Sequence, residues 1–224
     1  VMIEAKKLAY ADMLRYVADP QFSRVPVAGL LAKSYAATRA ALIDPARAQA
    51  QVNPGEPPGG SDTTYLCTVD RDGNMVSLIQ SNYSGFGSGL VGEGAGFGLQ
   101  NRGGLFTLEA THPNALAGRK RPLHTIIPAF VTKDGRPWLS FMAKGDTRIA
   151  FGIMGGWNQS QAHAQFVANV VDFGMNLQAA LEAPRFTKQT FGGNDVEIES
   201  RVPAEVRTAL AARGHALEVI APFG

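Results

Sequence analysis

Two adjacent threonines, Thr63 and Thr64, begin a segment whose pattern predicts a β-strand over residues 63–69. Proline and glycine dominate the residues just before them, from Pro54 to Gly60, and predict a flexible linker. A threonine hydroxyl is a weak nucleophile unless a base lies beside it, and the α-amino group of a chain's first residue can supply that base. The reference pKa of that amine, roughly 7.7–8, leaves a useful neutral fraction at pH 7.

A precursor could create such a terminus by cutting itself between Asp62 and Thr63. The hydroxyl would attack the preceding carbonyl, and water would then release the upstream piece. A flexible tether followed by a fixed strand suits this reaction, because one side can leave while the other stays in place. The same tether is also common before threonine-rich strands that have no such chemistry, so the pattern alone leaves both interpretations open.

Acyl transfer also needs fixed donors for the negative charge that develops on the carbonyl oxygen. Gly155 and Gly156, in the segment IMGGWNQ, are candidates because glycine lets backbone N–H groups approach a substrate closely, although an ordinary strand-to-helix turn would explain the pair equally well. His124 and His163 lie far apart with no cluster of cysteines or carboxylates, which argues against a metal site. We interpret His163 as a capping or packing residue, and we predict neither a metal nor a cofactor.

The elements that position these residues follow from hydrophobic periodicity and turn signals. Helical spacing predicts helices over residues 3–17 and 27–43, and the linker covers residues 46–62. After the linker, strands over 63–69 and 74–81 flank an Arg-Asp-Gly turn and predict a hairpin.

Further elements are predicted beyond a glycine-rich stretch. They are strands over 124–132, 137–141, 147–153, 196–199 and 217–220, and helices over 161–173, 177–182 and 203–213. Strands come first as hairpins and helices follow in blocks, which favours antiparallel sheets layered with helices over a doubly wound fold. The predicted fold class is therefore α+β.

Composition narrows the classes of protein. The chain has 224 residues, of which 45% are hydrophobic and 18% charged, as expected for a globular protein with a core. A net charge of +2 gives no argument for nucleic acid or an anionic membrane. The single cysteine, Cys67, excludes an internal disulfide, and no apolar run has the length of a membrane span. Both ends look cut, so we expect a fragment of a longer protein and leave its compartment open.

Several blocks, in the same order, resemble the γ-glutamyltranspeptidase family of N-terminal-nucleophile hydrolases. DTTYLCTVDRDGNMVSLIQSNYSGFGSGLV, LQNRGGLF, HPNALAGRKRPLHTIIPAF and GIMGGWNQSQAHAQFVANVVDFGMNLQAALEAPRF resemble its small subunit, and KLAYADMLRYVADPQFSRVPVAGLL resembles the end of its large subunit. The resemblance implies an αββα sandwich of stacked antiparallel sheets between helix layers, incomplete in this fragment. It also implies a helical end of the large subunit over 1–45, a linker over 46–62 that ends at the cleavage site, and a truncated catalytic small subunit over 63–224.

The resemblance assigns the nucleophile. Thr63, rather than Thr64, matches the family's threonine, and the implied cleavage lies between Asp62 and Thr63. Ser81 matches a hydroxyl that hydrogen-bonds to that threonine. The processed enzyme would be a heterodimer of the large and small pieces of one precursor, with no partner among nucleic acids.

The oxyanion hole is assigned in the same way. Gly155 and Gly156 match the family's Gly-Gly pair. Residues 143–148 can also be aligned with that pair, but the helix that follows Gly156 favours the later position.

Some substrate-binding positions depart from the family pattern. The acidic residue that holds the substrate's ammonium falls at Leu105, a glutamine at Arg102 and an asparagine at Tyr83. His124 and Thr125 replace a pair of serines. The site would therefore lose the partner of an ammonium and gain a guanidinium, which can pair bidentately with a carboxylate. The substrate-binding candidates are Tyr83, Arg102, His124 and Thr125.

The resulting prediction is a γ-glutamyltransferase or glutathione hydrolase-like enzyme. It would cleave a γ-glutamyl amide through a threonyl acyl-enzyme and pass the acyl group to water, an amino acid or a peptide. A glutaryl- or cephalosporin-type amide acylase of the same fold is the close rival, because Arg102 suits a dicarboxylic acyl group that lacks an amine. A homologue that folds without cutting itself is the non-catalytic alternative.

Overall fold

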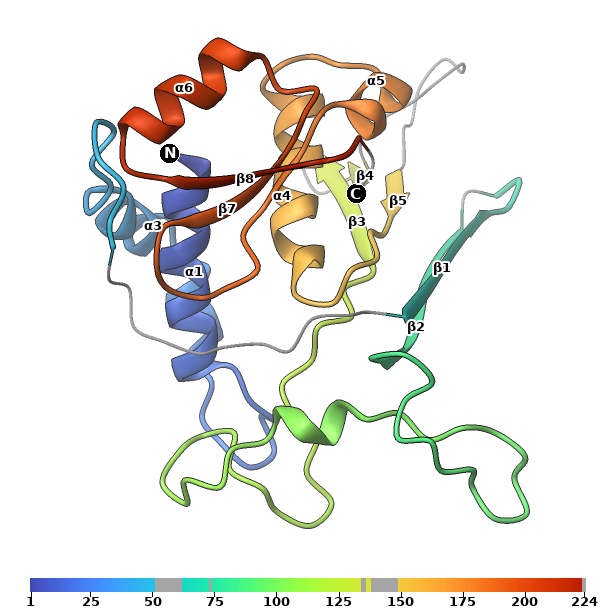
Figure 1. Ribbon diagram of the computed structural model, residues 1–224. Coiled ribbons are helices and arrows are strands. Elements are labelled where there is room, and N and C mark those ends of the chain that lie inside the picture. The colour runs from blue at the N-terminus through green and yellow to red at the C-terminus, as the bar shows by residue number, and fades with distance from the viewer. Residues whose placement is uncertain (51–61, 73, 134–135, 138–148, 223–224) are drawn as a thin grey trace. The chain divides into compact units, whose positions relative to one another are not determined.

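The computed structural model describes residues 1–50, 62–72, 74–133, 136–137 and 149–222, which belong to two compact units (Figure 1). Unit 1 consists of Val1–Gly59, Gly103–His124 and Gln165–Gly224, and unit 2 of Gly60–Arg102 and Thr125–Ala164. Each unit therefore gathers segments that are distant in the sequence. Most of the predicted linker lies outside the described residues.

Unit 1 begins with the helix α1 (Met2–Tyr16), which confirms the first predicted helix. Its buried face carries Ile3, Leu8 and Tyr10, as the helical spacing of apolar residues requires. Two lysines, Lys6 and Lys7, are buried on the same helix. Sequence analysis treated neither of them as an interior residue.

The prediction of a single helix over residues 27–43 is wrong. The chain instead forms α2 (Val27–Leu30) and α3 (Lys33–Ala40), and Ala32 between them is extended with ψ 131°. None of the described residues of either helix is buried, so tertiary packing does not hold one long helix together. Gly29 lowers the local helix propensity further.

The sheet of unit 1 has the strand order β6 (Phe186–Thr187), β7 (Asp195–Glu199), β8 (Ala216–Ile220). β6 pairs with β7 in the antiparallel sense, but β7 and β8 are parallel, which corrects the prediction of purely antiparallel sheets. The helix α6 (Ala204–Ala212) lies between β7 and β8 in the chain and returns it to the end at which β7 began. The strands β7 and β8 and the helix α6 were all predicted, whereas the two-residue β6 was not.

Unit 2 contains the predicted first hairpin. Its strands β1 (Asp62–Val69) and β2 (Met75–Tyr83) pair in antiparallel register, with Leu66 opposite Leu78. The alternating apolar pattern and the turn after Asp70 account for this pairing.

A second sheet of unit 2 has the order β4 (Arg136–Pro137), β3 (Ala129–Lys133), β5 (Ile149–Phe151). The strand predicted from His124 starts only at Ala129, because a proline at position 128 cannot donate to a ladder. Residues 138–148 lie outside the described part, and with them most of the predicted strand 137–141 and the start of 147–153. A Cβ at Gly152 would collide with the ring of Tyr65, so the chain after β5 passes close to β1.

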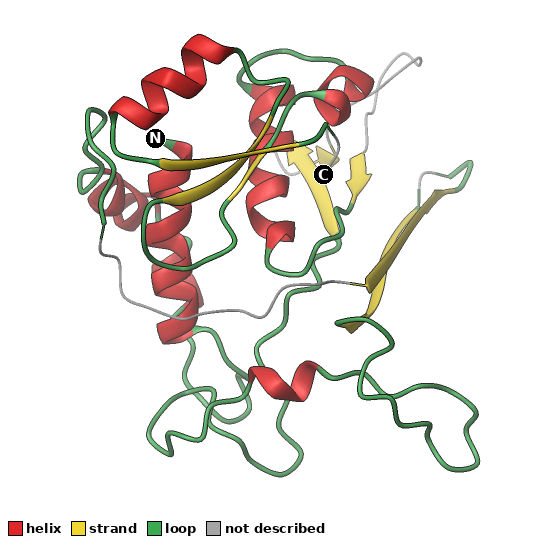
Figure 2. Ribbon diagram, viewed as in Figure 1, coloured by secondary structure: helices red, strands yellow, loops and turns green. Residues whose placement is uncertain are grey.

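The remaining elements are η1 (Arg102–Leu105), α4 (Asn158–Val171) and α5 (Leu177–Glu182). α5 has its predicted bounds, and Asn176 caps it by accepting a 2.9 Å hydrogen bond from the N–H of Ala179. α4 begins three residues before its prediction, and the division between the units falls inside it. Long loops join β2 to η1 and η1 to β3 (Figure 2). The described residues confirm the α+β class.

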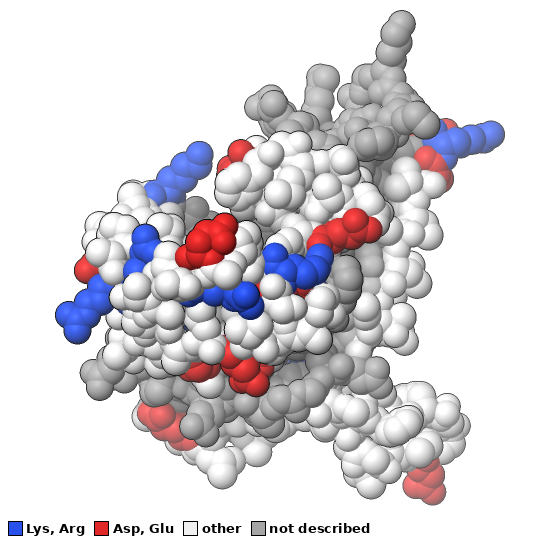
Figure 3. All heavy atoms as spheres, turned by 45° about the horizontal axis from the view of Figure 1, so that its top comes forward, with Lys and Arg blue, Asp and Glu red and all other residues white. Residues whose placement is uncertain are grey.

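Charged side chains do not gather by sign on the face shown in Figure 3, where basic and acidic residues are interspersed among uncharged ones. Among the helices that the structure describes, none combines the length and the apolar character that a bilayer span requires.

Candidate active site

The start of the hairpin in unit 2 brings two predicted residues together. Thr63 lies opposite Ser81 in the strand register, and the two hydroxyl oxygens are 3.0 Å apart in a hydrogen bond. Asp62 lies opposite Tyr83, so the register shifts by one residue at this point, as in a β-bulge. A bulge re-aims side chains, and here it coincides with the hydroxyl pair.

Thr64 takes a different position from Thr63. Neighbouring residues of a strand point to opposite faces, and Thr64 lies opposite Gln80. Thr64 is exposed and lines a cavity of about 360 Å³ together with Ser81, Gln80 and residues 97–100. Thr63 therefore takes part in the hydroxyl pair, whereas Thr64 faces this cavity.

The backbone of Tyr83 fixes the Ser81 side chain. The N–H of Tyr83 donates to Ser81 Oγ at 2.9 Å, and Tyr83 has a positive φ of 79°. That conformation costs about 1–3 kcal/mol for a residue other than glycine, and it persists only where the surroundings impose it. Ser81 Oγ is thus held on two sides, by the nucleophile candidate and by a strained backbone.

Arg102 joins Tyr83 to Thr125 inside unit 2. The guanidinium carbon of Arg102 lies 4.9 Å from the centre of the Tyr83 ring, within the range of a cation–π contact. Its Nη1 donates to Thr125 Oγ1, and Arg102 and Thr125 are only 1% and 3% exposed. Nη2 of Arg102 is buried and has no hydrogen-bond partner among the described residues.

Burial sets the electrostatics of this cluster. It lowers the pKa of the Arg102 guanidinium, since removing a cation from water disfavours the charged form, although Tyr83 acts in the opposite direction. Burial also raises the pKa of the Tyr83 hydroxyl, against the opposing effects of Trp157 and Arg102. Arg102 is therefore a buried cation, and one of its donors has no acceptor among the described residues.

Gly155 and Gly156 form a turn that leads into α4. Their φ angles are 121° and 53°, values that favour glycine, and the N–H of Asn158 donates to the carbonyl of Gly155 at 2.8 Å. The turn follows β5, which is held beside the hairpin by the Ser77 hydroxyl donating to the carbonyl of Phe151 at 3.5 Å. Free N–H groups at a helix start are suitable donors to an oxyanion.

Gln159 and His163 lie one helical turn apart on α4. They position the chain around the Gly155–Gly156 turn. The side-chain oxygen of Gln159, a fully buried residue, accepts from the N–H of Ile127 at 2.9 Å. His163 Nε2 accepts from the N–H of Ile153 at 3.1 Å, and burial lowers the pKa of His163 to about 4. These bonds support the interpretation of His163 as a packing residue. From the sequence, Gln159 had a place in the block that resembles the family but no predicted role, and its i, i+4 spacing from His163 was the only further signal.

One substrate-binding candidate, His124, falls outside unit 2. His124 is exposed and belongs to unit 1, whereas Thr125 belongs to unit 2. The described residues contain no group of three or more His, Cys, Asp or Glu side chains arranged to hold a metal ion. The alternative Gly-Gly alignment at residues 143–148 lies outside the described part.

The chain is similar to known proteins along its whole length. The family model described as "Gamma-glutamyltranspeptidase" matches residues 1–224. The chain is 35% identical over 226 residues to the "Glutathione hydrolase-like YwrD proenzyme" of Bacillus subtilis (strain 168), a match that covers 100% of this chain and 40% of the relative. It is 32% identical over 228 residues to the "Glutathione hydrolase proenzyme" of Escherichia coli (strain K12), with 96% and 37% covered.

Among solved structures, the cephalosporin acylase from Bacillus halodurans is similar to the chain with a TM-score of 0.79 and 44% sequence identity. That match covers 98% of this chain and 37% of the acylase chain. The chain thus spans about 40% of the length of the first of these relatives, and less of the others.

Proposed function

The chain belongs to the γ-glutamyltranspeptidase family, and we propose that the complete protein cuts itself before Thr63 and then uses Thr63 to cleave acyl amides. The observation that carries this proposal is the 3.0 Å bond between Thr63 Oγ1 and Ser81 Oγ at the start of β1. The names of the relatives, which describe proenzymes of hydrolases, support it. The proposal includes the αββα sandwich, of which the described sheets would be parts.

In the cutting step, Thr63 Oγ attacks the carbonyl carbon of Asp62. A C–O bond forms as the C–N bond between the two residues breaks, and the amine of Thr63 takes up the hydroxyl proton. Water then hydrolyses the resulting ester, which frees the upstream carboxylate and the Thr63 hydroxyl. Ser81 holds the hydroxyl in place, and the strained Tyr83 backbone holds Ser81.

In the catalytic step, the freed amine accepts the proton of its own hydroxyl while Oγ attacks the substrate's amide carbon. Negative charge develops on the carbonyl oxygen, for which the N–H groups of Gly155 and Gly156 are the proposed donors. The proton passes to the leaving amine as the C–N bond breaks, leaving an ester on Thr63. Attack by water, or by an acceptor amine, releases the acyl group and restores the threonine.

For the substrate we propose a γ-glutamyl amide first, with a glutaryl-type amide as the second candidate. The observation that favours the second is Arg102, a buried cation whose Nη2 has no acceptor among the described residues. A carboxylate at the end of an acyl chain would offset the cost of burying that charge. Leu105 supplies no carboxylate for the α-ammonium of a glutamyl group.

The experiment is a comparison of γ-glutamyl-p-nitroanilide with glutaryl-p-nitroanilide as substrates of the complete protein. A higher kcat/KM for the glutaryl compound would support the role of Arg102, and a strong preference for the γ-glutamyl compound would contradict it. Thr63→Ala is expected to abolish both cutting and hydrolysis. A Thr63→Ala protein that hydrolyses either compound would exclude the mechanism.

A further inference from the structure

Unit 1 is built from chain on both sides of Thr63. Residues Val1–Gly59 precede the proposed cleavage site, and residues Gly103–His124 and Gln165–Gly224 follow it. A cut before Thr63 would therefore leave unit 1 composed of two separate pieces. The contacts that cross between these pieces decide whether they stay together.

Lys6 makes one such crossing. Its ammonium donates to the carbonyl oxygens of Lys188 and Thr190 at 2.8 and 2.9 Å, and it lies 4.0 Å from the centre of the Tyr10 ring. The Tyr10 ring in turn contacts the ring of Phe191, with centroids 5.2 Å apart. Lys6 is only 6% exposed, so α1 inserts this side chain into the loop that follows β6.

Lys7 makes a second crossing beside it. Its ammonium is fully buried and lies within 3.2 Å of three oxygens, one in an ion pair and two as hydrogen-bond acceptors. These are Glu4 Oε1 at 2.8 Å, the carbonyl of Gln49 at 2.9 Å and Asn194 Oδ1 at 3.2 Å. The first two precede Thr63, whereas Asn194 lies on the other piece.

Lys188 shapes the loop that receives Lys6. Its fully buried ammonium binds Asp195 Oδ1 at 2.8 Å, Thr190 Oγ1 at 2.7 Å and the carbonyl of Gly192 at 2.6 Å. The loop thus closes around the Lys188 ammonium, while the carbonyl oxygens of Lys188 and Thr190 accept from Lys6. We call Lys6, Lys7 and Lys188 together the lysine clamp.

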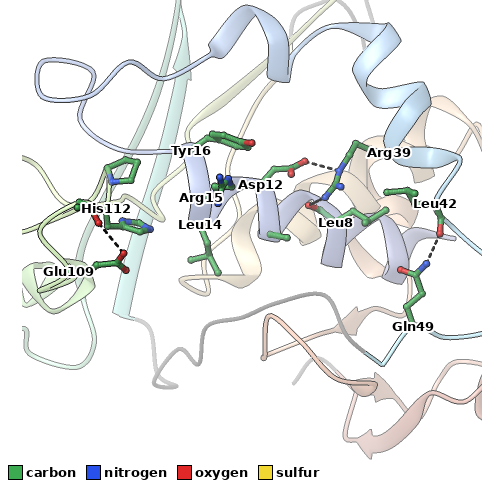
Figure 4. A pocket seen from close by; sticks show the side chains of 13 residues that line it. Leu8, Asp12, Leu14, Arg15, Tyr16, Arg39, Leu42, Gln49, Glu109 and His112 are labelled. Atoms are coloured by element: carbon green, nitrogen blue, oxygen red, sulfur yellow. Dashed lines mark hydrogen bonds and ion pairs between the residues drawn. The ribbon is translucent and has the colours of Figure 1, made fainter.

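Apolar packing is incomplete elsewhere between the same pieces. A cavity of about 830 Å³ separates α1 and α3 from the loop that carries Glu109 and His112 (Figure 4). Leu8, Leu14 and Leu42 line it on the side that precedes Thr63. Close packing therefore contributes little to holding the two pieces together along this stretch.

A second polar contact stands apart from the clamp. The buried carboxylate of Asp19 accepts from Arg121 through Nη2 at 2.9 Å, Nε at 3.2 Å and the backbone N–H at 3.0 Å. The N–H of Ala48 also donates to the carbonyl of Arg213 at 2.6 Å.

We propose that the lysine clamp is the joint that keeps the two cleavage products together, and that this joint weakens as the pH falls. The proposal rests on the proposed cleavage before Thr63. The upstream piece contributes Lys6 and Lys7 of α1 to this joint. The downstream piece contributes the carbonyl and carboxamide oxygens that accept hydrogen bonds from them.

The sign of the pH dependence follows from the groups that surround Lys6. Burial, with the charges of Lys188 and Lys7, lowers the pKa of Lys6 to about 7, although Asp195 acts in the opposite direction. A separated piece would expose Lys6 and return its pKa toward the ordinary 10.5. Separation therefore takes up a proton between pH 7 and 10.5, so the joint gains stability as the pH rises through that window and loses it as the pH falls.

Two other titratable groups beside Lys6, Lys188 and His215, act in the same direction. Burial lowers the pKa of Lys188 and of His215, which faces Glu4, Lys7 and Lys188. Burial raises the pKa of Asp195, but the hydrogen bonds from Lys188 and Thr190 outweigh it and the net change is a lowering. The groups that lower the pKa of Asp195 lie on its own piece, so separation leaves them in place. Burial and the charge of Lys7 lower the pKa of Lys188 and of His215, so these two groups bind protons more readily once the pieces separate and weaken the joint in acid.

The test uses the complete protein with an affinity tag on the part that precedes Thr63 and a protease site inserted after Gly60. Cutting at that site separates the same two pieces whether or not the protein cuts itself. The tagged piece is captured, and release of the downstream piece is followed at pH 9 and pH 6.5. We expect retention at pH 9 and a dissociation constant roughly tenfold or more higher at pH 6.5, since one proton taken up changes it about tenfold per pH unit.

Lys6→Arg and Lys6→Met separate the clamp from ordinary packing. Arginine stays charged at all these pH values and methionine has no charge, so both should lose the part of the pH dependence between 7 and 9 that Lys6 contributes. Lys33→Met, at an exposed residue of α3 on the same piece, is the matched control and should behave as the unmodified chain.

Two results would overturn the proposal. One is equal retention, or equal loss, at pH 9 and pH 6.5 in the unmodified chain. The other is an undiminished pH dependence in both Lys6 variants. A chain that does not cut itself but shows the expected behaviour after the engineered cut would reject the proposed cleavage and leave the clamp intact.

Discussion

Buried cations are treated in opposite ways in the two units. In unit 1, Lys7 and Lys188 are fully buried and each reaches a carboxylate and further oxygens at hydrogen-bond distance. In unit 2, Arg102 is buried just as completely, but it rests on the Tyr83 ring and a single hydroxyl, and its Nη2 has no acceptor among the described residues.

The difference indicates what each charge is for. A buried charge whose bonds are complete contributes to holding a structure, and removing one partner leaves the other uncompensated. A buried charge with an unused donor carries a cost that the folded chain does not offset by itself. We infer that the lysines of unit 1 serve assembly and that Arg102 serves a ligand.

The largest effect on stability should come from breaking the buried ion pair of Lys7 with Glu4 in unit 1. Lys7→Met leaves the Glu4 carboxylate buried without its cation, and we expect a loss of about 3–5 kcal/mol in the free energy of unfolding. Urea denaturation measures it, with Lys33→Met expected within about 0.5 kcal/mol of the unmodified chain. If Lys7→Met lost no more unfolding free energy than Lys33→Met, the contrast between the buried cations of the two units would be contradicted.

The hydroxyl pair of unit 2 should affect rate more than stability. Ser81→Ala removes the acceptor 3.0 Å from Thr63 Oγ1, and we expect self-cutting and hydrolysis to slow by roughly 100-fold, or about 2.7 kcal/mol in activation free energy. Single-turnover rates and urea denaturation of the same variant separate the two effects. Slowing matched by an equally large loss of unfolding free energy would show a structural role instead.

Arg102→Gln sharpens the comparison from the other side. Removing an incompletely bonded cation should change the free energy of unfolding by less than about 1 kcal/mol, while kcat/KM for a substrate with a terminal carboxylate falls by about 10- to 100-fold. The matched control is an acyl p-nitroanilide without that carboxylate, whose kcat/KM should not fall. Equal losses for both substrates would contradict carboxylate recognition.

The smallest expected effect concerns His163, a satisfied group in unit 2. Its pKa is lowered to about 4 by burial, against 6.5 when exposed, so the unfolded state binds more protons between those values. The free energy of unfolding should therefore fall as the pH drops from 6.5 to 4, by on the order of 1 kcal/mol after solvent screening. Denaturation of His163→Met across that range should lack this component, and an unchanged slope would show that another group causes it.

Helices and strands that depend on local sequence signals were predicted correctly. The hairpin of β1 and β2 follows from alternation and a turn, and α5 and α6 follow from an asparagine cap and from a proline before the first turn. The parallel pairing of β7 with β8 depends on where α6 returns the chain, which no local pattern records. The break at Ala32 reflects missing tertiary contacts, which the sequence does not display either.

The site was predictable in part. Family resemblance indicated Thr63 with Ser81 and grouped Tyr83, Arg102 and Thr125, which the structure brings into contact in these two sets. The strained backbone of Tyr83 had no sequence signal, because a tyrosine seldom adopts a positive φ. The lysine clamp was missed because adjacent lysines on an amphipathic helix ordinarily face solvent.

The intact mass of the complete purified protein tests the central claim most directly. The account predicts two fragments, of which the downstream one begins with Thr63, and a single uncut chain for Thr63→Ala. An uncut unmodified protein that still hydrolyses acyl amides, or a downstream fragment that begins with Thr64, would contradict it.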